Sequence, residues 1–239
     1  MNIKVQLLAY TAEPERVVAT AARACYSEKT PPAIWEEMSD AEKVAKAIYI
    51  IKRSGHESPI EHASFTFSLA GVSRSLLAQI TRHRLASFSV QSQRYVEFKN
   101  SLPSTIPKTI ADDANAAPLF HYAVDTAYAT YNDLIERGIP PEDARFVLPE
   151  AANTNIVLTM NARELRHFFN LRCCQRAQWE IRQVAEEMYK QVFPIAPHIF
   201  DDAGPSCVTT GRCPEGTKSC GKINEVKELY QKIMGGSTE

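Results

Sequence analysis

The sequence predicts an α+β fold in which a mixed or antiparallel sheet is flanked by helices. Segments with alternating apolar residues precede long helical stretches, without the regular strand–helix alternation of a parallel sheet. No Gly-x-Gly-x-x-Gly turn is present, which argues against a dinucleotide-binding doubly wound sheet. The 239 residues suit a single domain, 1–239, with a cysteine-containing tail from about residue 201.

Apolar spacing predicts the individual elements. Residues 3–8 are expected to form a strand and residues 13–25 a helix, and Pro31 and Pro32 then interrupt the pattern. The elements expected after this interruption are a helix capped by Ser39 or Asp40 and stopping at Gly55, a strand over 63–69, a helix from Ser73 running into Arg82, a helix over 120–137, a strand over 156–160, helices over 161–172 and 177–193, and a short polar helix before Gly235-Gly236.

Composition narrows the class of protein. With 27 basic and 28 acidic residues the formal charge is -1, so any surface that binds polyanions must be local. The apolar runs are short, and the N-terminal residues carry no signal pattern, which predicts a cytoplasmic protein without a membrane partner. Six irregularly spaced cysteines indicate a reducing compartment and not a disulfide scaffold.

The densest polar segment covers residues 79–95. It contains Arg82, His83, Arg84 and Arg94 among several serines. Guanidinium groups present planar donor forks to phosphate, and serine hydroxyls add further donors, so two phosphorylated ligands could share this segment. The alternative is a solvated basic helix end that is stabilised by the helix dipole and binds nothing.

One spacing within this segment is specific. Arg82-His83-Arg84, seven residues and Ser92 reproduce the Arg-His-Arg-x7-Ser signature, and the chain resembles the flavin-dependent thymidylate synthases. Further stretches that are similar to this family, in the expected order, are residues 55–62, 144–149, 161–163, 170–172 and 177–180.

The resemblance implies an enzyme of de novo thymidylate synthesis. It implies reductive methylation of dUMP to dTMP, with 5,10-methylenetetrahydrofolate as the carbon donor and FAD, reduced by NADPH, as the hydride source. It also implies a homotetramer that binds FAD and dUMP at subunit interfaces, with no nucleic-acid partner.

The same resemblance implies the ligand contacts and names Arg172 as the catalytic residue. The residues expected to contact FAD are Ser58, Glu61, Arg82, His83, Arg84, Val90, Asn161, Ala162, Arg163 and His167. The residues expected to contact dUMP are Gln79, Ile80, Thr81, Arg82, Val90, Gln91, Ser92, Gln93, Arg94, Arg145 and Arg172.

Uracil chemistry gives an independent reason for these residue types. C5 of the ring becomes nucleophilic when negative charge develops on the ring, so a cation at the pyrimidine edge, Arg172, would stabilise that charge. The nucleotide phosphate needs its own anchor, for which Ser92, Arg94 and Arg145 are suited.

Purely structural roles compete with some of these assignments. Arg145 could pair with Glu142, and Arg172 with Glu164. Asn161 could cap its helix, a role that is compatible with ligand contact.

Two positions depart from the family pattern, and one stretch resembles a metal site. Val90 stands where many relatives carry Glu, and Arg176 where others carry His, so the side-chain contacts of these positions are in question. His56 and His62 flank Glu61, but the spacing is not His-Glu-x-x-His, so no metal is expected. In the family interpretation His56 is a neighbour of flavin and substrate; otherwise it is an ordinary loop histidine.

The cysteines offer a competing chemistry. The unrelated classical thymidylate synthases use a cysteine nucleophile, and Cys173 and Cys174 follow Arg172, but we expect both to be small buried residues. In the tail, cysteines and one histidine could hold zinc or form an oxidisable cluster, although their spacing is not that of a zinc finger. The residues of this tail group are Cys207, Cys213 and Cys220, with His198.

Two other function classes remain as alternatives. A nucleic-acid-binding module would use the arginines on phosphates, with Phe88 and Tyr95 stacking on bases, and would be colourless. A pyrimidine-modifying transferase without flavin would depend on Cys174.

Overall fold

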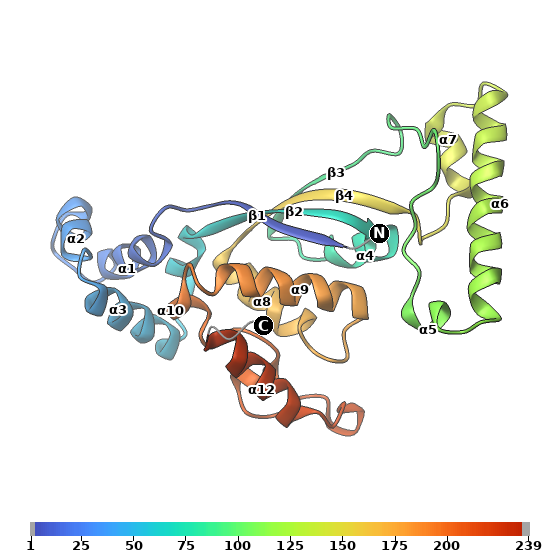
Figure 1. Ribbon diagram of the computed structural model, residues 1–239. Helices are drawn as coiled ribbons and strands as arrows, with labels where there is room; N and C mark the ends of the chain where they lie inside the picture. The colour runs from blue at the N-terminus through green and yellow to red at the C-terminus, as the bar shows by residue number, and fades with distance from the viewer. Residues whose placement is uncertain (1–2, 236–239) are drawn as a thin grey trace. The chain divides into compact units, whose positions relative to one another are not determined.

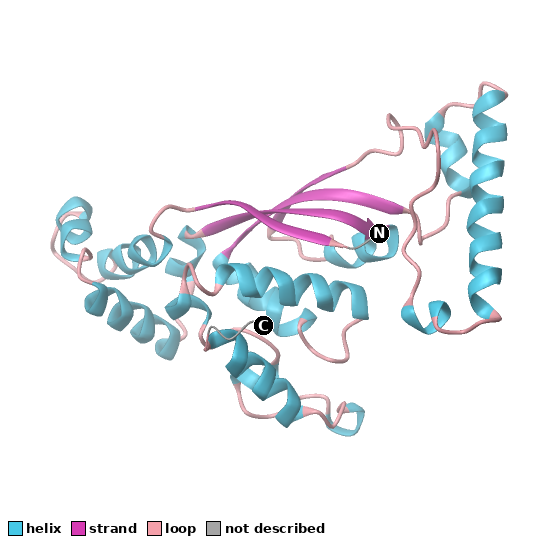
Figure 2. Ribbon diagram, in the orientation of Figure 1, coloured by secondary structure: helices cyan, strands magenta, loops and turns pink. Residues whose placement is uncertain are grey.

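The computed structural model describes residues 3–235 and has the expected α+β architecture (Figure 1). Its strands form one open sheet in the order β1-β2-β4-β3 (Figure 2). The strands are β1 (Lys4–Tyr10), β2 (Ser64–Ser73), β3 (Ala86–Val90) and β4 (Asn153–Asn161).

The register of β2 and β4 is antiparallel. The Thr66 hydroxyl lies 2.9 Å from that of Thr159. The backbone N–H of Gly71 donates to the Asn155 side chain at 3.1 Å. Residue numbers therefore rise along one strand while they fall along the other, which confirms the antiparallel alternative.

Contacts divide the chain into two compact units. Unit 1 consists mainly of Ser68–Arg82 and Phe88–Val157. Unit 2 consists mainly of Val5–Phe67, His83–Ser87 and the chain from Leu158 onward.

Unit 1 has a small apolar core of its own. Leu102, Val124 and Ala152 are buried in it, and Phe98 and Phe120 pack against them. Its helices are α4 (Arg74–Ile80), α5 (Lys108–Ala111), α6 (Ala116–Glu136), α7 (Pro141–Ala144) and the 3-10 turn η2 (Arg145–Val147).

Unit 2 has an aromatic core. Phe65 of β2 meets Phe200 at 5.6 Å between ring centroids, and Phe169 meets Tyr189 at 5.3 Å. Gln191 holds the β1 backbone by accepting from the N–H of Leu7 at 2.7 Å. The helices of this unit are α1 (Pro14–Ala24), α2 (Pro31–Glu37), α3 (Ala41–Ser54), α8 (Ala162–Arg172), α9 (Trp179–Val192), α10 (Pro197–Phe200), α11 (Ser206–Thr209) and α12 (Ile223–Met234), with 3-10 turns η1 (Ser58–His62) and η3 (Gly216–Lys218).

Helix α3 confirms its sequence signals. The Asp40 side chain accepts from the amides of Glu42 and Lys43, and Gly55 ends the helix with φ of 70°. A left-handed backbone conformation at this position favours glycine, because glycine has no Cβ.

The expectation that Pro31 and Pro32 only interrupt the chain is wrong, because they start helix α2. Proline is well placed in a first turn, where its missing N–H would have no helical partner. Strand β3 was also not expected. The Gly235-Gly236 end falls partly outside the described residues.

Among residues 3–235, no helix combines the length and the apolar composition that crossing a bilayer requires.

Candidate active site

A buried chain of hydrogen bonds in unit 2 fixes the orientation of Arg172. His83 Nδ1 lies 2.8 Å from Glu164 Oε1. On the other side of the ring, Arg172 Nε donates to His83 Nε2 at 3.0 Å. Only 4% of His83 and 6% of Glu164 are exposed, so water competes little for these bonds.

The protonation of His83 follows from this geometry. Burial lowers the pKa of His83 most strongly; the Glu164 hydrogen bond opposes this effect, and the charge of Arg172 lowers the pKa further. The imidazole is therefore neutral at pH 7, with Nδ1–H donating to the carboxylate and the Nε2 lone pair accepting from Arg172. Protonation of Nε2 would remove that acceptor.

Both hydrogen-bond partners of His83, Glu164 and Arg172, lie on helix α8. The Asn161 side chain caps the helix by accepting from the Glu164 amide at 2.8 Å, which confirms its expected capping role. Glu164 therefore lies in the first turn and Arg172 in the last. The basic triplet lies just beyond the end of α4, as expected, but His83 turns inward while Arg82 and Arg84 are exposed.

A cavity of about 700 Å³ lies beside this chain in unit 2. Two guanidinium groups of α8 contribute to its wall. Arg163 donates to Glu61 at 2.5 Å, and Arg166 pairs with Asp202. Burial alone would raise the pKa of Asp202, but the hydrogen bond and charge of Arg166 hold that pKa below its usual value. The residues lining the cavity are Glu57, Leu85, Arg163, Glu164, Arg166, His167, Asn170, Asp202, Ala203, Gly204, Thr209 and Thr210.

In unit 1, two expected phosphate ligands meet at Glu142. Arg94 Nε lies 2.5 Å from a carboxylate oxygen of Glu142. Arg145 Nε donates to the backbone carbonyl of the same residue at 3.0 Å. Arg145 thus contacts Glu142 through the backbone oxygen and not through the carboxylate pair that the sequence offered as the alternative, and its ligand role stays a prediction.

A second cavity, of about 400 Å³, lies next to Arg145. Arg74 and Gln93 also line it. The Nε2 atom of Gln93 is buried, and no hydrogen-bond partner exists for it among the described residues. A buried amide nitrogen in this state costs about 1–3 kcal/mol, which a ligand acceptor would recover.

Neighbouring expected residues support the local backbone of unit 1. Gln91 exchanges bonds with Asn155 of β4, since its amide donates to the Asn155 carbonyl at 2.9 Å and its side chain accepts from Asn155 at 2.8 Å. The Ser92 hydroxyl accepts from the amide of Arg94 at 3.1 Å. This turn fixes the backbone between β3 and Arg94.

The expected ligand residues are distributed over both units. Ile80 and Ala162 are fully buried, backbone included, so a ligand does not reach either residue in this conformation. Unit 2 contains Ser58, Glu61, His83, Arg84, Asn161, Ala162, Arg163, His167 and Arg172. Unit 1 contains Gln79, Ile80, Thr81, Arg82, Val90, Gln91, Ser92, Gln93, Arg94 and Arg145.

The competing chemistries have different outcomes. Cys173 is completely buried, and burial strongly raises the pKa of its thiol, which disfavours the thiolate that a nucleophile needs. Cys174 is only half-buried, so the expectation for it was wrong.

His56 lies 3.4 Å from the Tyr26 hydroxyl, with ring centroids 5.7 Å apart.

One side-chain group has the spacing of a metal site. Ligand atoms of His83, Glu164 and His167 lie within 4.8 Å of one another. Both ring nitrogens of His83 are already used by Glu164 and the cationic Arg172. A cation there would face a guanidinium group and would have to displace both hydrogen bonds, so the geometry favours the hydrogen-bonded chain.

Sequence reasoning missed the orienting role of Glu164. Asn161 followed three residues later by Glu164 resembles a capping box, which predicts an exposed carboxylate. The structure instead buries Glu164 against His83. Only the nearly complete burial, which depends on tertiary packing, distinguishes the two roles.

Comparisons with known proteins identify the family of the chain. A family model described as "Thymidylate synthase complementing protein" matches residues 6–198. A flavin-dependent thymidylate synthase of Geobacter sulfurreducens is 48% identical over 232 residues, covering 97% of this chain and 99% of the relative. A relative of the same description from Clostridium tetani is 46% identical, covering 96% and 98%.

A solved structure is also similar. It is the UMP/dUMP methylase PolB from Streptomyces cacaoi bound with 5-Br dUMP, with a TM-score of 0.70, 28% sequence identity, and coverage of 85% of this chain and 96% of the other. The extent of these matches leads to one conclusion. The chain belongs to the flavin-dependent thymidylate synthase family.

Proposed function

We propose that this chain methylates dUMP to dTMP, with 5,10-methylenetetrahydrofolate as the carbon donor and FAD, reduced by NADPH, as the hydride source. The family and the dUMP-analogue-bound relative support the substrate class. One structural observation carries the assignment to this chain. Gln93, whose buried Nε2 has no hydrogen-bond partner within residues 3–235, lines a cavity together with Arg74 and Arg145.

This cavity suits an anionic nucleotide. Two guanidinium groups, against the one carboxylate of Glu150, supply positive charge and forked donors for phosphate. The Gln93 amide would gain an acceptor on binding, and that gain favours the bound state. Arg145 would exchange its bond to the Glu142 carbonyl for a phosphate oxygen. Ser92 and Arg94 are proposed as further phosphate contacts.

The proposed catalytic residue is Arg172. Its guanidinium would lie at the N3 and carbonyl edge of uracil and stabilise the negative charge on the ring that makes C5 nucleophilic toward the one-carbon unit. His83 is a positioning residue in this proposal, because it binds Arg172 Nε with a ring that Glu164 orients. A preset guanidinium lowers the barrier because little reorganisation remains for the transition state.

The donors of unit 2 fit FAD. A cavity of about 700 Å³ is within the usual range for ligand pockets. Arg163, His167 and the threonine pair Thr209 and Thr210 can donate to a diphosphate. The N-terminus of the eleven-residue helix α8 adds a favourable dipole. When bound, FAD supplies the hydride that completes the methyl group.

We further propose the homotetramer with subunit-interface sites. Large apolar side chains are exposed on the single chain, including Phe146 at 83%, Tyr95 at 77% and Tyr122 at 73%. Phe146 lines the cavity that contains Gln93. Burial of such side chains against neighbouring subunits would stabilise an assembly. Sedimentation equilibrium tests this proposal, and a monomer that is fully active at assay concentrations would contradict it.

A visible spectrum tests the flavin cycle directly. We expect a yellow protein that bleaches when NADPH is added anaerobically and recovers its colour, with formation of dTMP, when dUMP and 5,10-methylenetetrahydrofolate follow. A protein that stays colourless after reconstitution with FAD would contradict the proposal and favour the nucleic-acid module or the flavin-independent transferase.

The Arg172→Ala variant tests the proposed catalytic role. It should retain FAD but lose dTMP formation, because the cation is absent while the proposed flavin residues remain. Arg53→Ala, at an exposed position of α3, is the matched control and should behave as the wild type. Wild-type turnover by Arg172→Ala would refute its role and leave the flavin assignment standing.

A further inference from the structure

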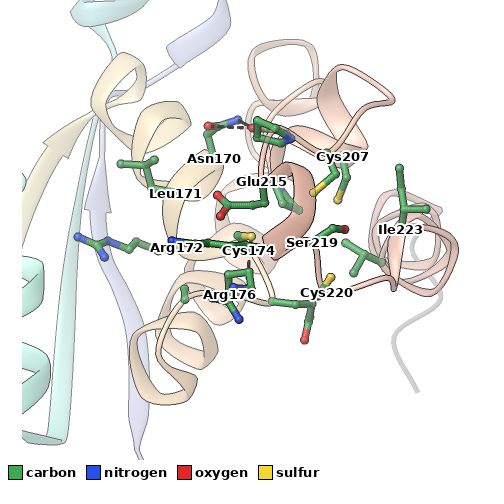
Figure 3. Close-up of a pocket in the computed structure, with 18 residues that line it drawn as sticks. Asn170, Leu171, Arg172, Cys174, Arg176, Cys207, Glu215, Ser219, Cys220 and Ile223 are labelled. Atoms are coloured by element: carbon green, nitrogen blue, oxygen red, sulfur yellow. Dashed lines mark hydrogen bonds between the residues drawn. The ribbon is translucent and has the colours of Figure 1, made fainter.

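Four cysteines of unit 2 line a single cavity of about 510 Å³. Cys174 comes from the connection between α8 and α9, and Cys207 from α11. Cys213 and Cys220 lie in the segments on either side of η3. Figure 3 shows Cys174, Cys207 and Cys220 around this cavity, while Arg172 extends away from them. The thiols converge although Cys174 is far from the others in sequence.

These thiols form a group that is distinct from the other cysteines. All four are half-buried, whereas Cys25 is exposed and Cys173 is inside the core; none forms a disulfide. All four line the same cavity, and neither Cys25 nor Cys173 lines it.

His198, which the sequence offered as a fourth ligand for the tail cysteines, is engaged elsewhere. Its Nδ1 lies 2.8 Å from Glu15, and its backbone amide donates to the same carboxylate. Cys174, and not His198, is the fourth possible ligand that lines the cavity. The ligand set is therefore four thiols, which favours soft metals and iron–sulfur clusters over hard cations.

The distances between the sulfur atoms distinguish a site for a single metal ion from a site for a cluster. Tetrahedral zinc with bonds of about 2.3 Å requires thiolates within about 4 Å of one another. Within the described residues, the one group of three ligand atoms that lie within 4.8 Å of one another is that of His83, Glu164 and His167, not the cysteines. No three of the four sulfur atoms therefore lie within 4.8 Å of one another, a spacing too wide for a single zinc ion but open to a multi-iron cluster that four cysteines hold.

The charge of the wall is consistent with an anionic centre. Arg176 and Lys218 line the cavity together with one carboxylate, Glu215. A four-iron cluster with four thiolate ligands carries net negative charge, which nearby cations stabilise.

We propose that Cys174, Cys207, Cys213 and Cys220 bind an iron–sulfur cluster of the four-iron, four-sulfide type. Each thiol releases its proton to solvent, and its sulfur replaces one water ligand on one iron. Two ferrous ions, two ferric ions and four inorganic sulfides are the co-reactants, so the cluster assembles with no net oxidation or reduction. Four protein ligands saturate the cluster, so its role is to tie the tail to the connection that follows Arg172. The site goes beyond the proposed function and does not depend on it.

The metal content of anaerobically purified protein tests the site. We expect about four iron ions and about four acid-labile sulfides per chain, with a Mössbauer spectrum of a cubane cluster. Mössbauer spectroscopy detects iron alone, so bound flavin does not interfere. Zinc in place of iron, or no iron after anaerobic reconstitution with ferrous and ferric salts and sulfide, would overturn the proposal.

Variants assign the ligands. Cys213→Ser and Cys220→Ser should each lose the iron, whereas Cys25→Ser, at an exposed cysteine outside the cavity, should retain it. Iron that persists in a Cys213→Ser/Cys220→Ser double variant would refute the assignment. If these variants do not fold, the iron and sulfide content of the wild-type protein still decides the proposal.

Discussion

Removal of the Glu164 carboxylate should release both His83 and Arg172. In Glu164→Ala the buried Nδ1–H of His83 loses the acceptor that now lies 2.8 Å away. Because only 4% of His83 is exposed, water does not replace that acceptor easily. The imidazole is then free to change tautomer or rotate, and Arg172 loses the fixed lone pair that orients it.

The burial of His83 and Glu164 determines how strongly Glu164→Ala destabilises the fold. An unsatisfied buried donor costs about 1–3 kcal/mol, and relief of the desolvation of a buried carboxylate offsets part of that loss. We expect a net destabilisation of about 2 kcal/mol in Glu164→Ala, which lowers the Tm by about 4–8 °C for a chain of this size. Glu164→Gln retains an acceptor and should lose about half as much.

The effect on catalysis is separate. If orientation of Arg172 contributes about 1.4–2.7 kcal/mol to the barrier, kcat falls about tenfold to hundredfold in Glu164→Ala. Differential scanning calorimetry measures the Tm, and single-turnover dTMP formation measures the chemical step. Glu61→Ala is the matched control for stability, because Glu61 also pairs with α8 through Arg163 but is largely exposed. An exposed pair contributes about 0–1 kcal/mol.

One result would refute this reasoning. If Glu164→Ala matches Glu61→Ala in Tm and turns over at the wild-type rate, the hydrogen-bonded chain neither stabilises the fold nor orients Arg172. A loss of stability with unchanged single-turnover rate would keep the structural role and remove the catalytic one. The order alanine, glutamine, wild type should hold for both measurements.

Three further results are expected. Burial lowers the pKa of His83 in the folded state below 6.5, so the neutral imidazole contributes its full stability above pH 6.5. This stability is lost as the pH falls, because the unfolded state then binds the proton more readily. The free energy of unfolding in urea should therefore depend less on pH in His83→Gln than in the wild type. Gly204→Ala should lower the Tm, since φ is +123° and a Cβ would lie 2.7 Å from the Tyr230 ring; an unchanged Tm would contradict this. Asn161→Ala should cost about 1 kcal/mol by calorimetry, and Asn161→Asp, which restores a cap, should not.

Local sequence predicted much of the secondary structure. The alternation of Phe65, Phe67 and Leu69 predicted β2, and all three side chains are buried. Asp40 and Gly55 predicted both ends of α3. These signals succeed because caps, turns and one-sided apolar faces depend on residues only a few positions apart.

Strand β3 shows where local signals fail. Residues 86–90 alternate, but their side chains are only partly buried, so the alternation between an apolar and a polar face is weak. Their strand conformation depends on pairing with β4, which lies far along the chain. This segment is a strand because a distant partner satisfies its backbone.

The sequence by itself determined the family, through Arg82-His83-Arg84 and the spacing to Ser92, and the ends of the main helices. Only the tertiary structure decided that Glu164 orients His83 and that Cys174 meets the tail cysteines. The physical reason is range: backbone preferences are set by neighbours in sequence, whereas burial, protonation and convergence of thiols are set by packing between segments that lie far apart in the chain.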